Sequence, residues 1–435
     1  MELITFSNIC LSGLLVLAGF IIYIIATGSR TLRNYLLTRL VLTIPTIWIL
    51  VTLVFLMMRV IPGDPVSATL KPGAANKLDV QERIGIMEVD RTVITATSED
   101  EVASYFDETG RLAGQDDFMI EESDDYQQCD SSPPSRSNAA SNNSDEEPII
   151  FCHVEASEVP ILRQYFDYLG DLAGFDLGRS ITVEADRPVG DIISDRLPAT
   201  LELTIPSIIF MLIFGIFTGA FAAHHHRGKS DYSLRISSVF IYSIPVFWMG
   251  LMFQLIFASE LGLLPVARRF SGRIPFEERT GFYLLDSLLD GDFSSSWIVI
   301  RHMILPTLTL GLALIGVFIR LTRSNMIEIL QEDYITASRA RGVPEKRVVY
   351  RHALRNSFIP IMTFIGLQVA VMLGGTILTE TTFSWDGMGK LIRDGIALRD
   401  FTVVQGAVTV FAVIVGVIST LTDILYAFID PRVRY

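Results

Sequence analysis

Apolar residues in this chain occur in long continuous runs rather than in alternation with polar ones. A helix needs about 20 apolar residues to cross the hydrocarbon core of a bilayer, whereas the strands of a membrane barrel alternate at every second position. Runs of sufficient length lie at 9–27, 36–61, 198–223, 235–258, 302–322, 358–378 and 404–428. The pattern therefore predicts an all-α membrane protein, a polytopic helical bundle with seven spans.

Charge divides the chain into two parts. Of its 435 residues, 50% are hydrophobic, and the formal net charge is −13. The segment 67–197 holds 28 acidic and 10 basic residues, a net charge of −18, so the remaining residues carry a net charge of +5. The middle of this segment, 97–148, is rich in Asp, Glu, Ser and Asn, a composition that predicts a segment without a packed core.

The distribution of Lys and Arg predicts how the spans are oriented, because short cytoplasmic loops carry an excess of these residues. They follow the first, third, fifth and seventh runs, at Arg30, Arg33, Arg39, Arg227, Lys229, Arg235, the loop 323–356, Arg432 and Arg434. The amino terminus and the acidic segment are then outside, and the carboxyl terminus is cytoplasmic. No basic residue precedes the run 9–27, so we interpret it as an uncleaved anchor rather than a secretory signal.

The loop between the fifth and sixth runs predicts a basic helix–turn–helix. Gly342 suits the left-handed residue that ends a helix, and Pro344 suits the first turn of the next helix. Ala337, Ser338 and Ala340 are small, so another surface could approach the first helix closely. A basic juxtamembrane loop of some other membrane protein is the plain alternative.

The sequence of this loop resembles that of a known family. Asp333-Tyr-Ile-Thr-Ala-Ser-Arg-Ala-Arg-Gly342, with the later Arg351-His-Ala-Leu-Arg-Asn356, is similar to the EAA loop of ABC-importer permeases of the dipeptide/oligopeptide class. Ile61-Pro-Gly-Asp-Pro65 and Glu380-Thr-Thr-Phe-Ser-Trp-Asp-Gly-Met-Gly389 also resemble stretches of that family. Thr336 stands where the general motif has its Glu, so a Glu-based contact is not carried over. The resemblance extends over 35–66 and 160–435.

The resemblance implies a fold and a function. The fold would be a type I ABC-importer permease core of six helices, to which the first run adds one extra amino-terminal helix. The chain would be a permease subunit for peptides or a similar small solute and not an enzyme; it would bind no cofactor, and partner subunits would use the ATP. The residues implied in coupling to the ATPase are Asp333, Tyr334, Thr336, Ala337, Ser338, Ala340, Arg341 and Gly342.

Partners and domains follow from the same resemblance. The implied partners are a second, similar permease that forms a heterodimer, two cytoplasmic ATPases, an extracytoplasmic solute-binding protein and membrane lipid, but no nucleic acid. The domains would be an extra anchor (1–34), the first core helix (35–66), the acidic extracytoplasmic segment (67–196) and the permease domain (197–435), which contains the coupling loop 323–356.

An ion-coupled secondary carrier is the alternative function. Such carriers place ionisable residues within spans, where Glu202, Arg320 and Asp423 lie together with the polar Gln368. Positions near span ends favour interfacial or packing roles for most of them. Inverted internal repeats would favour a carrier, and the sequence shows none. A sensor built on the acidic segment, a third class, would not need the paired helices of the basic loop.

Two smaller features invite other interpretations. His224-His-His226-Arg-Gly-Lys-Ser230 could suggest a metal site or the end of a phosphate-binding loop, but the first glycine of that loop would fall at 223, which is Ala. Consecutive histidines on a turn also rarely converge on one ion, so we expect a cytoplasmic turn. Cys129 and Cys152 share the outer segment and could form a disulfide there.

Overall fold

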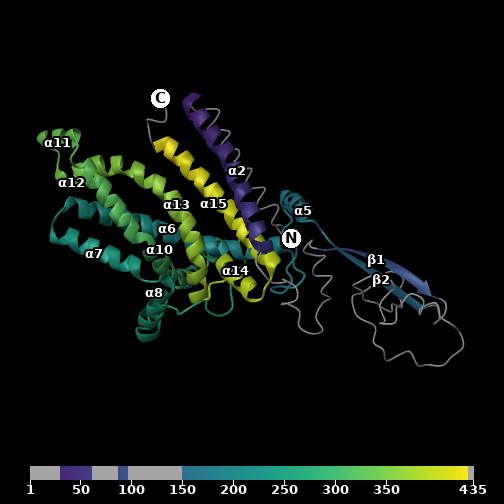
Figure 1. The fold of residues 1–435 in the computed structure, drawn as a ribbon. Coiled ribbons are helices and arrows are strands. Elements are labelled where there is room, and N and C mark those ends of the chain that lie inside the picture. The colour runs from purple at the N-terminus through teal and green to yellow at the C-terminus, as the bar shows by residue number, and fades with distance from the viewer. Residues whose placement is uncertain (1–29, 61–86, 97–148, 430–435) are drawn as a thin grey trace. The chain divides into compact units, whose positions relative to one another are not determined.

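The computed structural model describes residues 30–60, 87–96 and 149–429 (Figure 1). The predicted span 9–27 and the acidic middle 97–148 lie outside these residues, as does the turn at Ile61–Pro65. The chain divides into two compact units. The first comprises residues 1–60, 189–397 and 403–435, and the second comprises residues 61–188 and 398–402.

The described residues of the first unit form helices and the loops between them. Its helices are α2 (Arg30–Val60), α6 (Val189–His224), α7 (Lys229–Ser243), α8 (Val246–Phe253), the π-helix η1 (Gln254–Glu260), α9 (Tyr283–Leu289), α10 (Phe293–Ile329), α11 (Asp333–Ala340), α12 (Glu345–Arg347), the π-helix η2 (Val348–Ala353), α13 (Leu354–Thr382), α14 (Met388–Ala397) and α15 (Phe401–Ile429). The first two residues of α15 belong to the second unit.

Membrane-spanning helices confirm the predicted polytopic helical fold. Four helical stretches among the described residues are long and apolar enough to cross a bilayer, and a fifth is present if a bent pair counts as one span. The four are Val189–His224, Phe293–Ile329, Pro360–Thr382 and Phe401–Thr422. Helix α2 contains a shorter apolar stretch, Val41–Met57. The total of seven spans therefore stays a prediction.

The predicted span at 235–258 is not one continuous helix but falls in the bent pair. Helix α7 ends at Ser243, and α8 with η1 continues at an angle of 100°. Ile244 is extended between them, with ψ 127°, and Pro245 has no N–H to continue the helical hydrogen bonds. Hydropathy alone does not reveal this break, because apolar residues lie on both sides of it.

Helices α6 and α10 pack closely because glycines of α6 face α10. A Cβ atom at Gly215 would lie 2.7 Å from Cβ of Phe318, and one at Gly219 would lie 2.7 Å from Cβ of Thr322. Small residues at such contacts let helix backbones approach each other, which is a common mode of association between membrane helices. These two helices therefore form the centre of the first unit.

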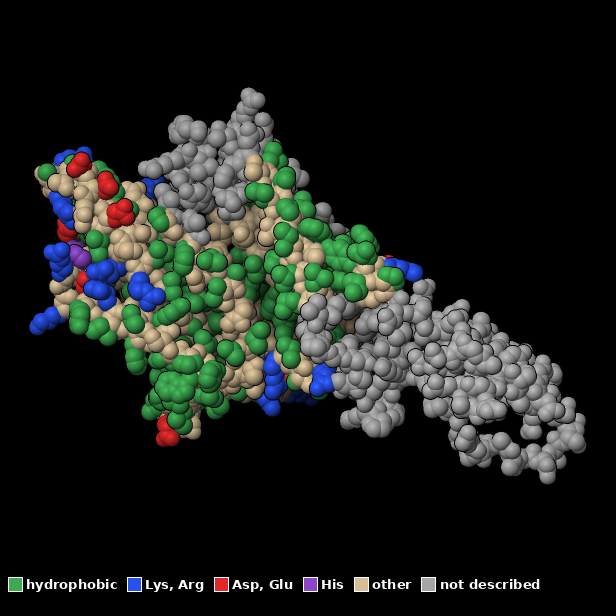
Figure 2. Space-filling view, viewed as in Figure 1, with side chains coloured by type: hydrophobic (Ala, Val, Ile, Leu, Met, Phe, Trp, Pro, Cys, Tyr) green, Lys and Arg blue, Asp and Glu red, His purple; other side chains and the backbone are tan. Residues whose placement is uncertain are grey.

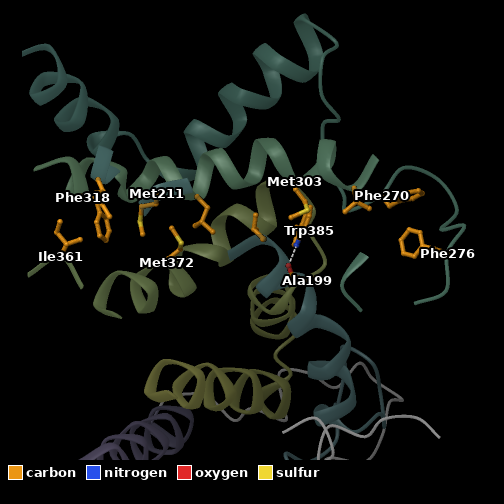
Figure 3. Packing of buried hydrophobic residues seen from close by; sticks show 13 residues of the cluster. Ala199, Met211, Phe270, Phe276, Met303, Phe318, Ile361, Met372 and Trp385 are labelled. Carbon is orange, nitrogen blue, oxygen red and sulfur yellow. Dashed lines mark hydrogen bonds between the residues drawn. The ribbon is translucent and has the colours of Figure 1, made fainter. Parts of the chain in front are cut away.

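A cluster of buried apolar side chains extends along this centre (Figure 3). Trp385, from the loop before α14, is fully buried, and its indole N–H donates to the carbonyl oxygen of Ala199 on α6 at 2.8 Å. Burial of an indole is favourable only when its N–H finds an acceptor.

The second unit contains a two-stranded sheet that the sequence did not predict. Strand β1 (Met87–Ala96) pairs antiparallel with β2 (Ile149–Glu158), and the register places Met87 opposite Glu158 and Ala96 opposite Ile149. Helix α5 (Ile161–Ala173) follows β2. Cys152 lies on β2, but Cys129 is outside the described residues, so the disulfide stays a prediction.

A buried carboxylate, Asp400, connects two segments of the second unit that are far apart in the sequence. Asp400 accepts four hydrogen bonds through one oxygen: from the Ser180 hydroxyl at 2.6 Å and from the backbone N–H groups of Ile181, Thr182 and Val183 at 2.8–3.0 Å. A carboxylate held by several N–H donors is strongly stabilised in its charged form. This contact, here called the Asp400 latch, joins the loop after α5 to the residues that precede and begin α15.

We expect Gly219→Ala to destabilise the helix pair, by about 1–3 kcal/mol for an overpacked contact. The added methyl would also lie 2.8 Å from the carbonyl oxygen of Ile319, which cannot move without distorting α10. Gly374→Ala is the matched control, because no atom lies within 4 Å of its would-be Cβ. Thermal unfolding of the purified protein in detergent measures both; equal midpoints for the two variants would contradict the packing account.

Candidate functional site

Residues 333–353, here called the α11–η2 element, form a folded structure between α10 and α13. Helix α11 begins at Asp333 and ends at Ala340, and Gly342 follows with φ +77°. The Gly342 N–H donates to the carbonyl oxygen of Arg339 at 2.9 Å, and the Val343 N–H donates to that of Ser338 at 3.3 Å. A glycine at this position ends the helix without the cost that a side chain would impose.

One face of α11 is buried against the ends of two membrane-spanning helices. Ile335 is fully buried and belongs to an apolar cluster that draws residues from three other elements. The other buried members are Ala220 and Ala223 of α6, Met326 of α10, and Val348, Val349 and Ala353 of η2. The element is therefore anchored on α6 and α10.

The opposite face of α11 is exposed and carries most of the residues predicted for coupling. The exposed ones are Asp333, Tyr334, Thr336, Ala337, Ala340, Arg341 and Gly342. Ser338 differs, because it is buried and its hydroxyl donates to the carbonyl oxygen of Tyr334 at 2.8 Å. Figure 2 shows Lys, Arg, Asp and Glu side chains gathered at the end of the first unit where Figure 1 places α11 and α12.

Two polar contacts hold the α11–η2 element in shape. The Arg339 guanidinium donates to both oxygens of Glu345, at 2.8 and 3.2 Å, which fixes the turn between α11 and α12. The hydrogen bond from Arg339 lowers the pKa of the Glu345 carboxyl. A lowered pKa means that the pair is fully formed at neutral pH and is lost only in acid. The Asn356 amide also donates to the Tyr334 hydroxyl, at 2.7 Å.

The element continues directly into a membrane-spanning helix. Helix α12, η2 and α13 follow one another without an intervening loop, from Glu345 to Thr382. The π-helical part, Val348–Ala353, contains three of the residues that bury Ile335. A displacement of α11 would therefore be passed to α13 through helical backbone, and to α6 and α10 through packed side chains.

A buried ion pair stabilises the neighbouring turn between α6 and α7. The Arg323 guanidinium on α10 donates to Oδ2 of Asp231 at 2.8 Å, and Asp231 is 2% exposed. The same carboxylate accepts the backbone N–H of Arg227 at 3.0 Å, and His226 Nδ1 lies 3.7 Å from it. Within the described ranges, no group of three or more His, Cys, Asp or Glu residues is arranged to hold a metal ion.

At the other end of α6, a buried carboxylate joins three helices. Glu380 of α13 is fully buried and accepts from the Thr200 hydroxyl of α6 at 2.7 Å and from the Lys390 N–H of α14 at 2.9 Å. A Cβ at Gly387 would lie 2.5 Å from Oε1 of Glu380, and one at Gly389 would lie 2.7 Å from the Ile377 backbone. Both glycines therefore give the carboxylate room to reach the first turn of α14.

A second buried pair lies close to Trp385. Arg269 donates to Oε2 of Glu202 at 2.6 Å and to the carbonyl oxygen of Gly281 at 2.8 Å. Its guanidinium carbon lies 3.7 Å from the centroid of the Tyr283 ring and 5.7 Å from that of Trp385. Glu202, which the sequence offered as a candidate ion site, is thus engaged in packing the loop 261–282 onto α6.

Glu380 lies in the stretch 380–389 that resembles the family, but its structural role was not predicted from the sequence. A usable signal was present, because a carboxylate at the end of an apolar run is followed by two closely spaced glycines, Gly387 and Gly389. The partner of Glu202 had no such signal, since Arg269 lies 67 residues further along the chain. Of the other candidates, Arg320 has its guanidinium carbon 5.1 Å from the ring centroid of Tyr242, and the side chain of Asp423 is outside the described set.

The fold and the α11–η2 element define a class: a multispan helical membrane protein that presents a folded surface beyond its apolar spans. Comparison with known proteins refines this class. Residues 215–435 match the family described as "Binding-protein-dependent transport system inner membrane component". The chain belongs to this family, and it is a multi-pass inner-membrane permease subunit of an ABC importer. Such an importer works with ATPase subunits and a solute-binding protein.

Individual relatives carry more specific names. The chain is 42% identical over 276 residues to the dipeptide transport system permease protein DppB of Alkalihalophilus pseudofirmus, covering 63% of this chain and 82% of that protein. It is 41% identical, with the same coverage, to the di/tripeptide permease DppB of Pseudomonas aeruginosa. It is 36% identical to the glutathione permease GsiC of Escherichia coli, covering 63% of this chain and 80% of that protein.

A solved structure is also similar. The MetNI methionine ABC transporter in an inward-facing conformation aligns with a TM-score of 0.41 and 14% identity, covering 53% of this chain and 93% of that chain.

We expect Glu380→Gln to destabilise the protein by about 1–3 kcal/mol, because an amide nitrogen cannot accept the hydrogen bonds that one carboxylate oxygen accepts and leaves buried donors unpaired. Asp386→Asn is the matched control: the side chain is 53% exposed and pairs with Lys390 and Arg196 at the surface, where ion pairs contribute about 0–1 kcal/mol. Thermal unfolding in detergent compares the two. A shift for Asp386→Asn as large as that for Glu380→Gln would refute the role of the buried carboxylate.

Proposed function

We propose that this permease carries peptides and that the exposed face of α11 is the surface on which a cytoplasmic ATPase docks. The cargo is proposed from the relatives, whose names specify dipeptides, di- and tripeptides, and glutathione. All of these are short chains joined by amide bonds. The docking surface is proposed from the exposed small and polar residues of α11, among which Ala337 and Ala340 leave its backbone accessible.

The single observation that supports the docking surface is the way α11 is mounted. Its buried face rests on α6 and α10 through Ile335, while its chain leads through η2 into α13. A force applied to the exposed face therefore reaches three long helices at once. Closure of an ATPase pair on ATP would move α11, and the spans would follow and expose the peptide path first to one side and then to the other.

The arrangement also completes the proposed assembly. The chain would pair with a second, similar permease, and each permease would contact one ATPase through its own α11 equivalent. The chain itself performs no covalent chemistry, and ATP is bound and hydrolysed by the ATPases. An ion-coupled carrier would need accessible ionisable groups, but Glu202 is 5% exposed and hydrogen-bonded to Arg269 and to the Leu284 N–H.

The proposal includes an orientation with seven spans, the amino terminus outside and α11 in the cytoplasm. The domains are proposed as before: the anchor 1–34, the first core helix 35–66, the outer segment 67–196 and the permease domain 197–435. Basic residues beside the α11–η2 element support a cytoplasmic location.

We expect Ala337→Trp to weaken ATPase binding about tenfold or more, because overpacking an interface costs about 1–3 kcal/mol and 1.4 kcal/mol corresponds to a factor of ten. Ala397→Trp is the matched control. Ala397 is also exposed, but it is the last residue of α14, which follows the opposite end of α13 from α11. Co-purification of the ATPase with each variant measures the effect. Normal recovery of the ATPase with Ala337→Trp would show that α11 is not the docking surface.

The orientation is tested by cysteine labelling in intact cells, with Cys10, Cys129 and Cys152 replaced by Ser. Helix α13, about 43 Å long at 1.5 Å per residue, separates α11 from α14. We therefore expect Ala397→Cys to react with a membrane-impermeant maleimide from outside and Thr336→Cys to react only after the cells are opened. Labelling of Thr336→Cys in sealed cells would show that the orientation is the opposite of the one proposed.

A further inference from the structure

Helix α5 of the second unit is amphipathic, and its apolar side is exposed. Positions 161, 162, 165, 166, 169 and 172 of this helix are Ile, Leu, Tyr, Phe, Leu and Leu, and at 100° per residue they fall on one side. Ile161 is 60% exposed, Leu162 72% and Phe166 66%. The described part of the chain thus leaves these three side chains uncovered.

The other side of α5 is polar and faces the rest of its unit in part. Gln164 is 7% exposed, and its amide donates to the carbonyl oxygen of Val159 at 2.7 Å. Arg163 and Asp167 form an exposed ion pair at 3.9 Å, one helical turn apart. Polar side chains of this side are thus engaged within the described structure, whereas Ile161, Leu162 and Phe166 of the apolar side are exposed.

The chain on both sides of the Asp400 latch leads into the membrane. Helix α6, which is long and apolar enough to span a bilayer, begins at Val189, 16 residues after the last residue of α5. Asp400 is followed immediately by Phe401, where the spanning helix α15 begins. Two of the chain connections between the units, Pro188–Val189 and Thr402–Val403, therefore lie at the start of a spanning helix.

We propose that α5 lies parallel to the membrane surface, in the membrane–water interface on the outer face of the membrane that the permease spans, with Ile161, Leu162 and Phe166 among the lipid acyl chains. Helices that bind in this way have a large apolar side and a polar side, and they insert about 5–10 Å into the boundary between headgroups and acyl chains. The occupant of the exposed side is thus the same lipid that surrounds α6 and α15.

Charge indicates which lipid headgroups α5 would accept. Its polar side carries Arg163 against Asp167 and Asp171, a net charge of −1. An acidic helix gains nothing from anionic lipids, unlike the Lys- and Arg-rich interfacial helices that depend on them. Binding would rest on the apolar side alone and would be insensitive to salt.

The complete importer in vesicles of zwitterionic phosphatidylcholine provides the test. A nitroxide is attached to Leu162→Cys, Phe166→Cys, Asp167→Cys or Asp171→Cys, with the native cysteines replaced by Ser. Relaxation by oxygen, which concentrates in lipid, is compared with relaxation by a water-soluble nickel chelate. We expect the ratio of oxygen to nickel accessibility to be several-fold higher at positions 162 and 166 than at 167 and 171.

The same pattern must appear without anionic lipid and at high salt. Where the protein without cysteines is not recovered, a photoreactive phenylalanine at position 166, with position 167 as control, is expected to cross-link to lipid at 166 only. High nickel accessibility at 162 and 166 would overturn the proposal by placing that side in water. Low accessibility to both reagents, or a protein cross-link from 166, would overturn it by showing that a protein covers the helix. ATP hydrolysis by the importer does not enter the readout, so the proposed ATPase docking stands or falls separately.

Discussion

The close approach of α6 to α10 is the contact on which the rest of the first unit depends. Gly215 and Gly219, one helical turn apart on α6, bring the two backbones together. Other parts of the unit pack on the two helices on either side of this contact. At one end Ala220, Ala223 and Met326 receive Ile335 of α11. Toward the other end of α6, Ala199 and Thr200 receive Trp385 and Glu380. Because helices in lipid gain little from hydrophobic burial against each other, this close packing must supply the cohesion.

The local features of the α11–η2 element could be predicted from the sequence, whereas its tertiary contacts could not. A helix ending at a left-handed Gly342 follows from backbone sterics, which act within a few residues. The burial of Ser338 depends on which side of α11 meets α6 and α10, and the small residues Ala337, Ser338 and Ala340 do not specify that side. The continuation of α12 through η2 into α13 was also hidden, because a π-helix has no sharp sequence signature.

The bend between α7 and α8 could not be predicted from the sequence either. Pro245 marks the break, yet Pro198, Pro206, Pro306 and Pro360 lie inside continuous helices. A proline removes one hydrogen bond, and whether the helix then breaks depends on what its neighbours offer the freed carbonyl groups. The contact between Glu202 and Arg269 could not be predicted either, because 67 residues separate them in the sequence.

The pairing of β1 with β2 has a consequence for the segment that joins the two strands. It places Ala96 opposite Ile149, so the intervening segment leaves and re-enters the fold at one place. The entropic cost of a loop rises only by about 0.6 kcal/mol for each doubling of its length. A change in the length of the segment between these two residues should therefore cost the pairing of β1 with β2 little.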